Sequence, residues 1–202
     1  DEAYRFARGE TVTSNSGQQA ALKRPLDFLV VADHAENLGL AQGLADSDPE
    51  LLKSSLGQQL NELLKAGKGR EAFYLLVQKM AKGPEAKISN ETFMRNVWKH
   101  NTEAAERYND PGKFTALIGY EWTSQPGGGN LHRVVVFRDN KALADQILPF
   151  SNFDSEDVED LWAFMNFYEE KTGGRVLAIP HNGNLSSGTM FLPSHQKTGK
   201  AI

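Results

Sequence analysis

The sequence predicts an α/β fold in which strands alternate with helices within one domain. Three short apolar runs with β-branched residues, 28–32, 115–120 and 176–180, have the length and composition of strands buried on both faces. Amphipathic segments of helical length separate these runs, an alternation typical of a sheet with parallel strands and crossover helices. The 202 residues suffice for a single domain with its own hydrophobic core.

The N-terminal part begins with a helical pattern. Over residues 2–7 the apolar side chains share one side of a helix, and the polar residues 11–17 then predict a loop. The first strand is expected over 26–32. Pro25 is compatible with this strand because proline is tolerated at a strand's start.

A long helical insertion is predicted over 39–109. Its first helix is expected to start at Asp48-Pro49-Glu50, which offers an aspartate cap, a proline at the first position and a glutamate in the first turn. That helix carries a leucine stripe at helical spacing and ends near Gly67. A second helix is expected over 70–81, and a third from Asn90 or the residue before it. We expect these helices to pack outside the strand layer.

The C-terminal part repeats the alternation of strand and helix. A glycine-rich connection over 124–130 follows the second strand, and a further strand is predicted over 134–137. A helix over 155–172 then has Ser155 as its expected cap and ends at a glycine pair. The last strand is expected over 175–180.

The composition argues against several classes of function. A net charge of −4 without a basic cluster disfavours a nucleic-acid-binding surface, because phosphate contacts need grouped lysines and arginines. No apolar stretch approaches the roughly 20 residues of a membrane span. The sequence contains no cysteine, so a metal site here must use histidine and carboxylate ligands. The composition is compatible with an exported or periplasmic location and equally with a cytoplasmic one. The residues at both ends of the sequence lead us to expect a piece of a larger protein.

Four metal-competent residues stand at the ends of predicted strands. Glu121 and His181 directly follow their strands, whereas His132 comes just before its strand. The pair Asp33-His34 follows the first strand, and since adjacent strand residues point to opposite faces, we expect one direct ligand and one supporting residue. Residues at the carboxyl ends of strands share one crevice in α/β folds, so these side chains are expected to converge.

Each of these residues also has a purely structural interpretation. Asp33 would cap a helix and leave His34 exposed. Taken alone, His132 is better explained as structural because it stands at the start of its strand. His100 within a helix and His195 in a polar tail are predicted to be structural as well.

Two further observations favour a functional interpretation. A carboxylate such as Glu121 is costly to bury after an apolar run unless it is paired or bound to a metal. The tight polar turn after His181 is expected to place Asn182 and Asn184 near the site as supporting donors. No phosphate loop, nucleophile elbow, His-Glu-x-x-His motif or dinucleotide fingerprint occurs in the sequence.

Short motifs occur in a characteristic order along the chain. They are Asp33-His34, then Gly119-Tyr120-Glu121, then His132 before an apolar strand, and His181 after one. In this order they resemble motifs of the polymerase and histidinol phosphatase (PHP) superfamily. Three longer stretches resemble a bacterial family of unknown function with a PHP-like domain: Tyr4 to Glu10, Arg24 to Phe28 and Ala178 to Asn184.

The resemblance implies a distorted (β/α)7 barrel, of which residues 1–202 would form a single, incomplete domain with the helical insertion inside it. It also implies up to three divalent metal ions in the complete domain, zinc, manganese or iron, at the carboxyl ends of the strands. The implied activity is that of a metal-dependent, phosphoesterase-like hydrolase in which metal-bound water attacks a small-molecule ester.

The resemblance also assigns roles to individual residues. Asp33 and Glu121 would be the catalytic carboxylates. Glu121 would bridge two ions, and Asp33 would support the neighbouring ligand His34. The implied metal ligands are His34, Glu121, His132 and His181.

Two motifs of the superfamily do not occur in this sequence, a His-x-His on the first strand and an Asp-x-His on a late strand. Two rival hypotheses therefore stay open. A non-catalytic PHP-like scaffold or binding module would retain the fold without the chemistry. In an ordinary α/β domain the histidines would have no shared role. The side chains of His34, Glu121, His132 and His181 would then not converge in space. Neither nucleic acid nor a membrane is expected as a partner, and the oligomeric state is open.

Overall fold

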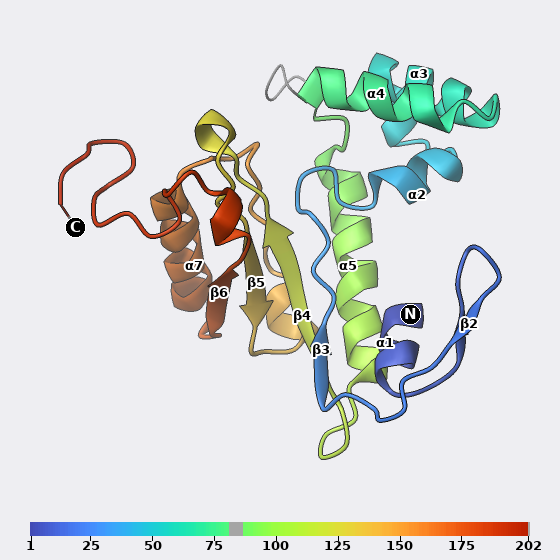
Figure 1. Cartoon of the computed structure of the whole chain (residues 1–202), viewed down its shortest axis with the longest axis horizontal. Coiled ribbons are helices and arrows are strands. Elements are labelled where there is room, and N and C mark those ends of the chain that lie inside the picture. Colours follow the sequence, from blue (N-terminus) through green and yellow to red (C-terminus); the bar gives the residue numbers. More distant parts are fainter. Residues whose placement is uncertain (81–86, 202) are drawn as a thin grey trace.

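The computed structural model describes residues 1–80 and 87–201, and its centre is a four-stranded sheet in the order β3-β4-β5-β6. β3 runs parallel to β4, and β5 runs antiparallel to both of its neighbours. β3, β4 and β6 therefore point in one direction and β5 in the other (Figure 1). The strands are β3 (Phe28–Val30), β4 (Thr115–Trp122), β5 (Arg133–Phe137) and β6 (Val176–Pro180).

Helices cover one face of this sheet. From α5 (Glu91–Tyr108), Trp98 packs edge-on against Tyr120 of β4, with ring centroids 6.0 Å apart. From α7 (Val158–Thr172), Tyr168 packs against Phe137 of β5 at 4.9 Å. Helix α1 (Glu2–Ala7) contacts α5 and β3, and the short α6 (Lys141–Ala144) contacts α5. The predicted α/β class is thus confirmed, with both main helices on the same side of an open sheet.

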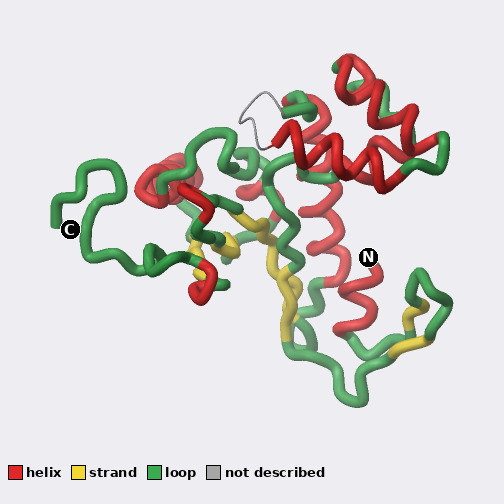
Figure 2. The backbone as a smooth tube through the Cα atoms, turned by 45° about the horizontal axis from the view of Figure 1, so that its top comes forward, coloured by secondary structure: helices red, strands yellow, loops and turns green. Residues whose placement is uncertain are grey.

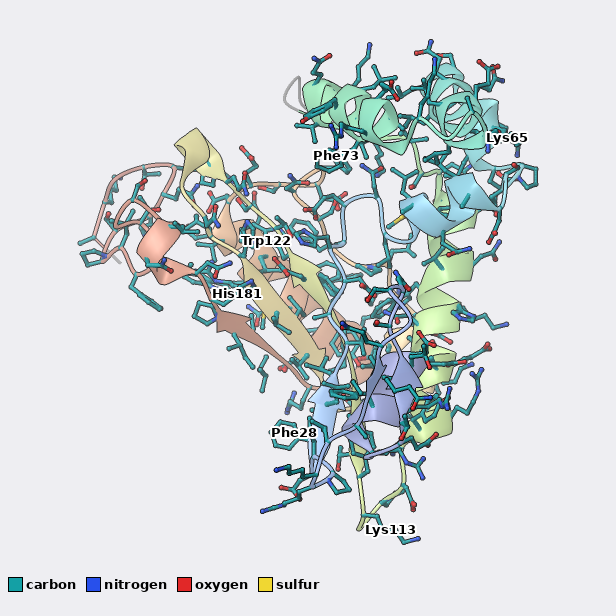
Figure 3. All side chains as sticks on the ribbon, turned by 45° about the vertical axis from the view of Figure 1, so that its right-hand side comes forward. Phe28, Lys65, Phe73, Lys113, Trp122 and His181 are labelled. Atoms are coloured by element: carbon teal, nitrogen blue, oxygen red, sulfur yellow. The ribbon has the colours of Figure 1, made fainter. Side chains whose placement is uncertain are left out.

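The opposite face of the sheet carries exposed apolar side chains. Phe28 is 64% exposed, and Leu177 and Ile179 are each about half exposed. Figure 3 shows Phe28 projecting from β3 away from the helices. The prediction of strands buried on both faces is therefore wrong for β3 and β6, because no described helix packs on this side and both are edge strands.

A second helical unit lies beyond the end of the sheet (Figures 1 and 2). It contains α2 (Leu40–Ala45), a 3-10 turn η1 (Leu51–Lys53), α3 (Ser55–Lys65) and α4 (Gly69–Met80). These helices have their own hydrophobic core, to which Phe93 of α5 also belongs. Trp98 of the same helix belongs instead to the core beneath the sheet, so α5 contributes to both cores. The predicted insertion is thus mainly helical over its described residues, and its last helix, α5, covers the sheet together with α7.

Several element boundaries differ from the prediction. Residues 11–17 were predicted as a loop, but β1 (Val12–Thr13) pairs with β2 (Gln19–Ala20) in a small hairpin. The helix expected from Asp48 begins instead at Ser55, because the Ser54 hydroxyl accepts from the Gly57 amide and caps it. The expected end of the second helix at Ala81 lies outside the described residues.

Polar side chains cap the two helices that cover the sheet. Asn90, one of the two residues from which this helix was predicted to start, caps α5 by accepting from the Phe93 amide. For α7 the cap is Asp157 and not Ser155, since the Asp157 carboxylate accepts from the amide of Glu159. Two 3-10 turns, η3 (Pro126–Gly128) and η4 (Gly183–Leu185), flank the end of the sheet where β4 and β6 terminate. Within the described ranges, no helix has the length and hydropathy needed to cross a membrane.

Candidate metal centre

The strand directions bring the four predicted ligands to one edge of the sheet. β3, β4 and β6 end at this edge, and there lie His34, Glu121 and His181. Because β5 is antiparallel, it begins at the same edge, and His132 stands directly before its first residue. The position that made His132 look structural in the sequence is therefore the one that places it in the cluster.

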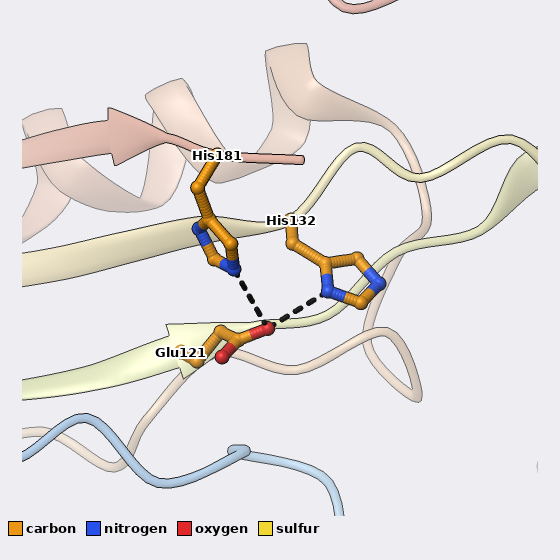
Figure 4. Close-up of side chains that lie close together, drawn as sticks. All are labelled: Glu121, His132 and His181. Atoms are coloured by element: carbon orange, nitrogen blue, oxygen red, sulfur yellow. Dashed lines mark ion pairs between the residues drawn. The ribbon is translucent and has the colours of Figure 1, made fainter. Parts of the chain in front are cut away.

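Glu121 lies at the centre of this cluster. Strand alternation directs Tyr120 and Trp122, both fully buried, into the helix-covered core and turns Glu121 to the other face. There its Oε1 atom lies 2.8 Å from Nδ1 of His132 and 3.4 Å from Nε2 of His181 (Figure 4). Two imidazoles thus share one carboxylate oxygen.

The donor set fits a divalent metal ion. One atom each from Glu121, His132 and His181 lies within 4.8 Å of the others. Ligand atoms on one tetrahedral zinc ion lie roughly 3.4 Å apart when each bond is about 2.1 Å, so small side-chain adjustments would seat an ion among them. These three residues could therefore hold a metal.

Observations on two of the imidazoles support this interpretation. Nδ1 of His181 is buried and has no hydrogen-bond partner among the described residues, although its Nε2 faces Glu121. Burial lowers the pKa of His132 and so favours the neutral imidazole, although the Glu121 charge acts in the opposite direction. A neutral imidazole is the form that binds a metal.

His34 approaches the cluster from β3 but keeps a more exposed position. Its Nε2 atom lies 3.9 Å from Oε2 of Glu121, the carboxylate oxygen that the other two histidines do not use. Its Nδ1 atom lies 2.7 Å from Oγ1 of Thr123 and 3.3 Å from Oε1 of Glu36. Histidine ligands usually have their second ring nitrogen held by a carboxylate or another acceptor in this way.

Glu36 is the main electrostatic partner of His34. Its side chain is buried, and its Oε2 atom has no partner among the described residues. The hydrogen bond that the His34 ring donates to Glu36 raises the pKa of His34, although partial burial of the ring acts in the opposite direction. A positive charge near His34, from a proton or a metal ion, would satisfy this buried carboxylate.

Three residues that hold the ligands were missed in the sequence. Thr123 also donates to Oε1 of Glu121, at 3.2 Å. The side-chain amide of Gln125 lies 3.2 Å from Nε2 of His132. Glu36 and Thr123 each stand two positions after a predicted ligand, and this spacing is the signal that could have found them. Gln125 offers no such signal.

Other predicted residues lie outside the cluster. Asp33 pairs with Glu121 only through its backbone oxygen, and its side chain is exposed. Because His34 is paired with Glu121 in the bridge that continues the sheet, the alternation of side chains directs Asp33 to the opposite side, the one that α1 contacts. Asn182 and Asn184 are exposed, and among the described contacts neither side chain bonds a ligand. The supporting and catalytic roles of Asp33, Asn182 and Asn184 stay predictions.

The two histidines predicted to be structural do not belong to the metal-competent group found among the described residues. His100 lies on the exposed side of α5. His195 lies 2.9 Å from a carboxylate oxygen of Glu159 on α7.

Comparison with protein families gives one match. The family described as "Protein of unknown function (DUF3604)" matches residues 1–202, the whole chain. The chain belongs to the DUF3604 family. No curated protein and no solved structure matches this DUF3604 chain.

Proposed function

We propose that this DUF3604 chain is a metal-dependent, phosphoesterase-like hydrolase of small-molecule esters. The observation that carries the proposal is the convergence of Glu121, His132 and His181, with His34 beside them, at one edge of the sheet. Residues from four different strand ends meet there, which is how α/β enzymes assemble sites. The resemblance of the same residues to the PHP motifs supports this assignment independently.

Glu121 has the geometry of a bridging ligand. Its Oε1 atom serves His132 and His181, whereas its Oε2 atom faces His34. This division of the two oxygens supports more than one ion, and we propose zinc, manganese or iron, with up to three ions in a complete domain. A bound divalent ion would supply Lewis-acid chemistry, activating water and polarising the ester.

The residues of the chain would then position this chemistry. Glu36 and Thr123 hold the ring of His34 by its Nδ1 atom, so that Nε2 faces the cluster. His34 has a side chain that is 58% exposed, whereas that of His132 is 8% exposed. Substrate would therefore approach from the side of His34, with the buried His132 behind the reacting atoms.

The open sheet suits the proposed barrel. Residues of β3, β4 and β6 that face away from the helices are mostly apolar, and Glu121 stands at the end of this same face. We propose that this face lines the inside of a distorted (β/α)7 barrel. A non-catalytic scaffold or binding module is the second candidate, because exposed apolar surface of this kind also marks interaction sites.

Zinc binding and hydrolysis separate these two functions. We expect zinc-loaded protein to hydrolyse bis(4-nitrophenyl) phosphate, and His181→Ala to weaken zinc binding and hydrolysis together. His195→Ala is the matched control, because His195 pairs only with Glu159, away from the cluster. Zinc binding without hydrolysis would favour the binding module. Unchanged zinc affinity and turnover in His181→Ala would refute the catalytic hypothesis.

A further inference from the structure

A large cavity lies among the helices of the second helical unit, next to His34. It has a volume of about 460 Å³, opens to solvent and is bounded mainly by α2, α3 and α4. Ligand pockets of proteins typically measure about 300–1,000 Å³, so the cavity can hold a substantial organic group. Its apolar lining consists mainly of Leu40, Leu44, Leu60, Leu64, Ala72 and Leu76.

The chemistry of the cavity changes along its length. The leucines of α2 and α3 form a buried apolar floor that belongs to the second hydrophobic core. Polar side chains line only the end toward the sheet, where His34, Glu36 and Asn37 are found. A ligand that fits this arrangement has an apolar body and a polar or charged end directed at His34.

An aromatic side chain stands exposed on the wall of this cavity. Phe73 of α4 lines it and is 62% exposed. Figure 3 shows Phe73 on the side of α4 that faces the sheet. An exposed aromatic ring contributes little to folding and much to binding an apolar ligand, because it buries its surface only when that ligand is present.

The cavity and the candidate metal centre share one residue. The His34 ring lines the cavity and also presents Nε2 to Glu121 at 3.9 Å. A molecule whose polar end is at the metal centre therefore has its remaining part beside the cavity mouth.

We propose that the cavity binds the apolar organic group, an aryl ring or a medium-length alkyl chain, of the ester that is hydrolysed at Glu121, His132 and His181. This inference rests on the proposed function and extends it to a substrate class, esters of hydrophobic alcohols. Helices α2–α4 are then the element that selects the substrate. The polar site alone would accept any small ester of suitable charge.

Binding of an alkylphosphonate series tests the proposal without relying on turnover. Calorimetry on zinc-loaded protein compares methyl-, butyl-, hexyl- and octylphosphonate, which share one headgroup and differ in chain length. We expect binding to tighten by about fourfold for each methylene that enters the cavity, until the cavity is full. Equal affinities for all four phosphonates would overturn the proposal while leaving the metal centre intact.

Variants on α4 localise the effect. Phe73→Ala should weaken octylphosphonate binding by at least about threefold, since it removes apolar contact area, and should leave methylphosphonate binding unchanged. Tyr74→Ala is the matched control, because Tyr74 is its equally exposed neighbour but does not line the cavity. Gly69→Trp should abolish the chain-length effect, since a side chain there enters open space beside the cavity.

A metal-free arm distinguishes failure of this inference from failure of the proposed function. In ligand-observed NMR, metal-free protein should bind 1-octanol more tightly than 1-butanol, and Gly69→Trp should remove the difference. If the alcohols behave in this way but no phosphonate binds better with zinc, the cavity is an apolar site and the hydrolase proposal fails. If neither series depends on chain length, the cavity inference is wrong.

Discussion

His34 pairs with Glu121 in a parallel bridge at the point where β3 and β4 separate. The backbone secures this pairing on both sides, since the Glu121 amide donates to Asp33 and the Ala35 amide donates to the Glu121 carbonyl, each at 2.8 Å. Two predicted ligands are therefore held in register by the sheet itself. Main-chain hydrogen bonds fix their separation more firmly than a flexible loop would.

The first prediction concerns Glu121, which the other predicted ligands surround. Glu121→Gln keeps the size of the side chain but removes its charge, so zinc affinity should fall by at least about 100-fold. Calorimetry or equilibrium dialysis measures this directly. Glu159→Gln serves as the control, because Glu159 also pairs with a histidine, yet at the surface of α7. Equal zinc affinities of the two variants would exclude Glu121 as a ligand.

The second prediction concerns the pH dependence of the metal-free protein. The pKa of His34 is raised above its usual value by Glu36, so the folded state binds this proton more tightly than the unfolded state. The resulting stability is fully present below pH ~6.5 and is lost as pH rises through the folded pKa. Glu36→Gln should lower the pKa of His34 and flatten this dependence.

NMR titration of the His34 ring in wild type and Glu36→Gln measures the shift of its pKa, and urea unfolding between pH 5 and 8 measures the effect on stability.

His132 has the opposite effect on the pH dependence of stability. Its pKa is lowered by burial, so it destabilises the folded state as pH falls below ~6.5. An unchanged His34 pKa in Glu36→Gln would show that their contact does not exist in solution.

The third prediction concerns the residue that joins α5 to the sheet. Trp98 is buried, contacts Tyr120 and Phe137, and donates from Nε1 to the carbonyl of Ala144 at 3.0 Å. Trp98→Phe should lower the free energy of unfolding by about 2–3 kcal/mol, because it leaves a cavity and an unpaired carbonyl. Trp162→Phe on α7, where the ring is 43% exposed, should cost under ~0.5 kcal/mol.

These results show which parts of the fold the sequence could predict. Local signals worked where they act within one element: Asn90 caps α5, and the glycine after Thr172 ends α7 in a left-handed conformation. The apolar pattern of β6 also located its strand. That pattern could not show that one face of β6 stays open, because burial depends on which elements pack there.

The site was predictable in its residue types more than in its geometry. The order of acid and histidine along the chain indicated His34, Glu121 and His181. The antiparallel direction of β5 places His132 beside the other predicted ligands. Strand direction is a long-range property that no local pattern encodes. Supporting residues such as Glu36 were missed because their role depends on which ring they touch.

The fourth prediction compares the two carboxylates that flank His34 in the sequence. Asp33 was expected to support its neighbour, but its exposed side chain is directed to the face opposite that of His34, whereas the buried Glu36 contacts His34 at 3.3 Å. Removing a carboxylate that holds a ligand's second nitrogen typically weakens metal binding by about 10–100-fold. Glu36→Gln should therefore lower zinc affinity by roughly this factor, and Asp33→Asn should change it by less than about twofold.

Both substitutions replace a carboxylate by the isosteric amide within three residues of the same histidine, so each controls for the other. Zinc titrations at pH 7.5 should be accompanied by circular dichroism, which verifies that both variants keep the fold. If Asp33→Asn weakens zinc binding more than Glu36→Gln does, the Asp33 side chain must reach the site when metal is bound, and β3 must then change its conformation at residues 33–34. If neither variant affects zinc binding, His34 is not a ligand, and the metal centre consists of Glu121, His132 and His181 alone.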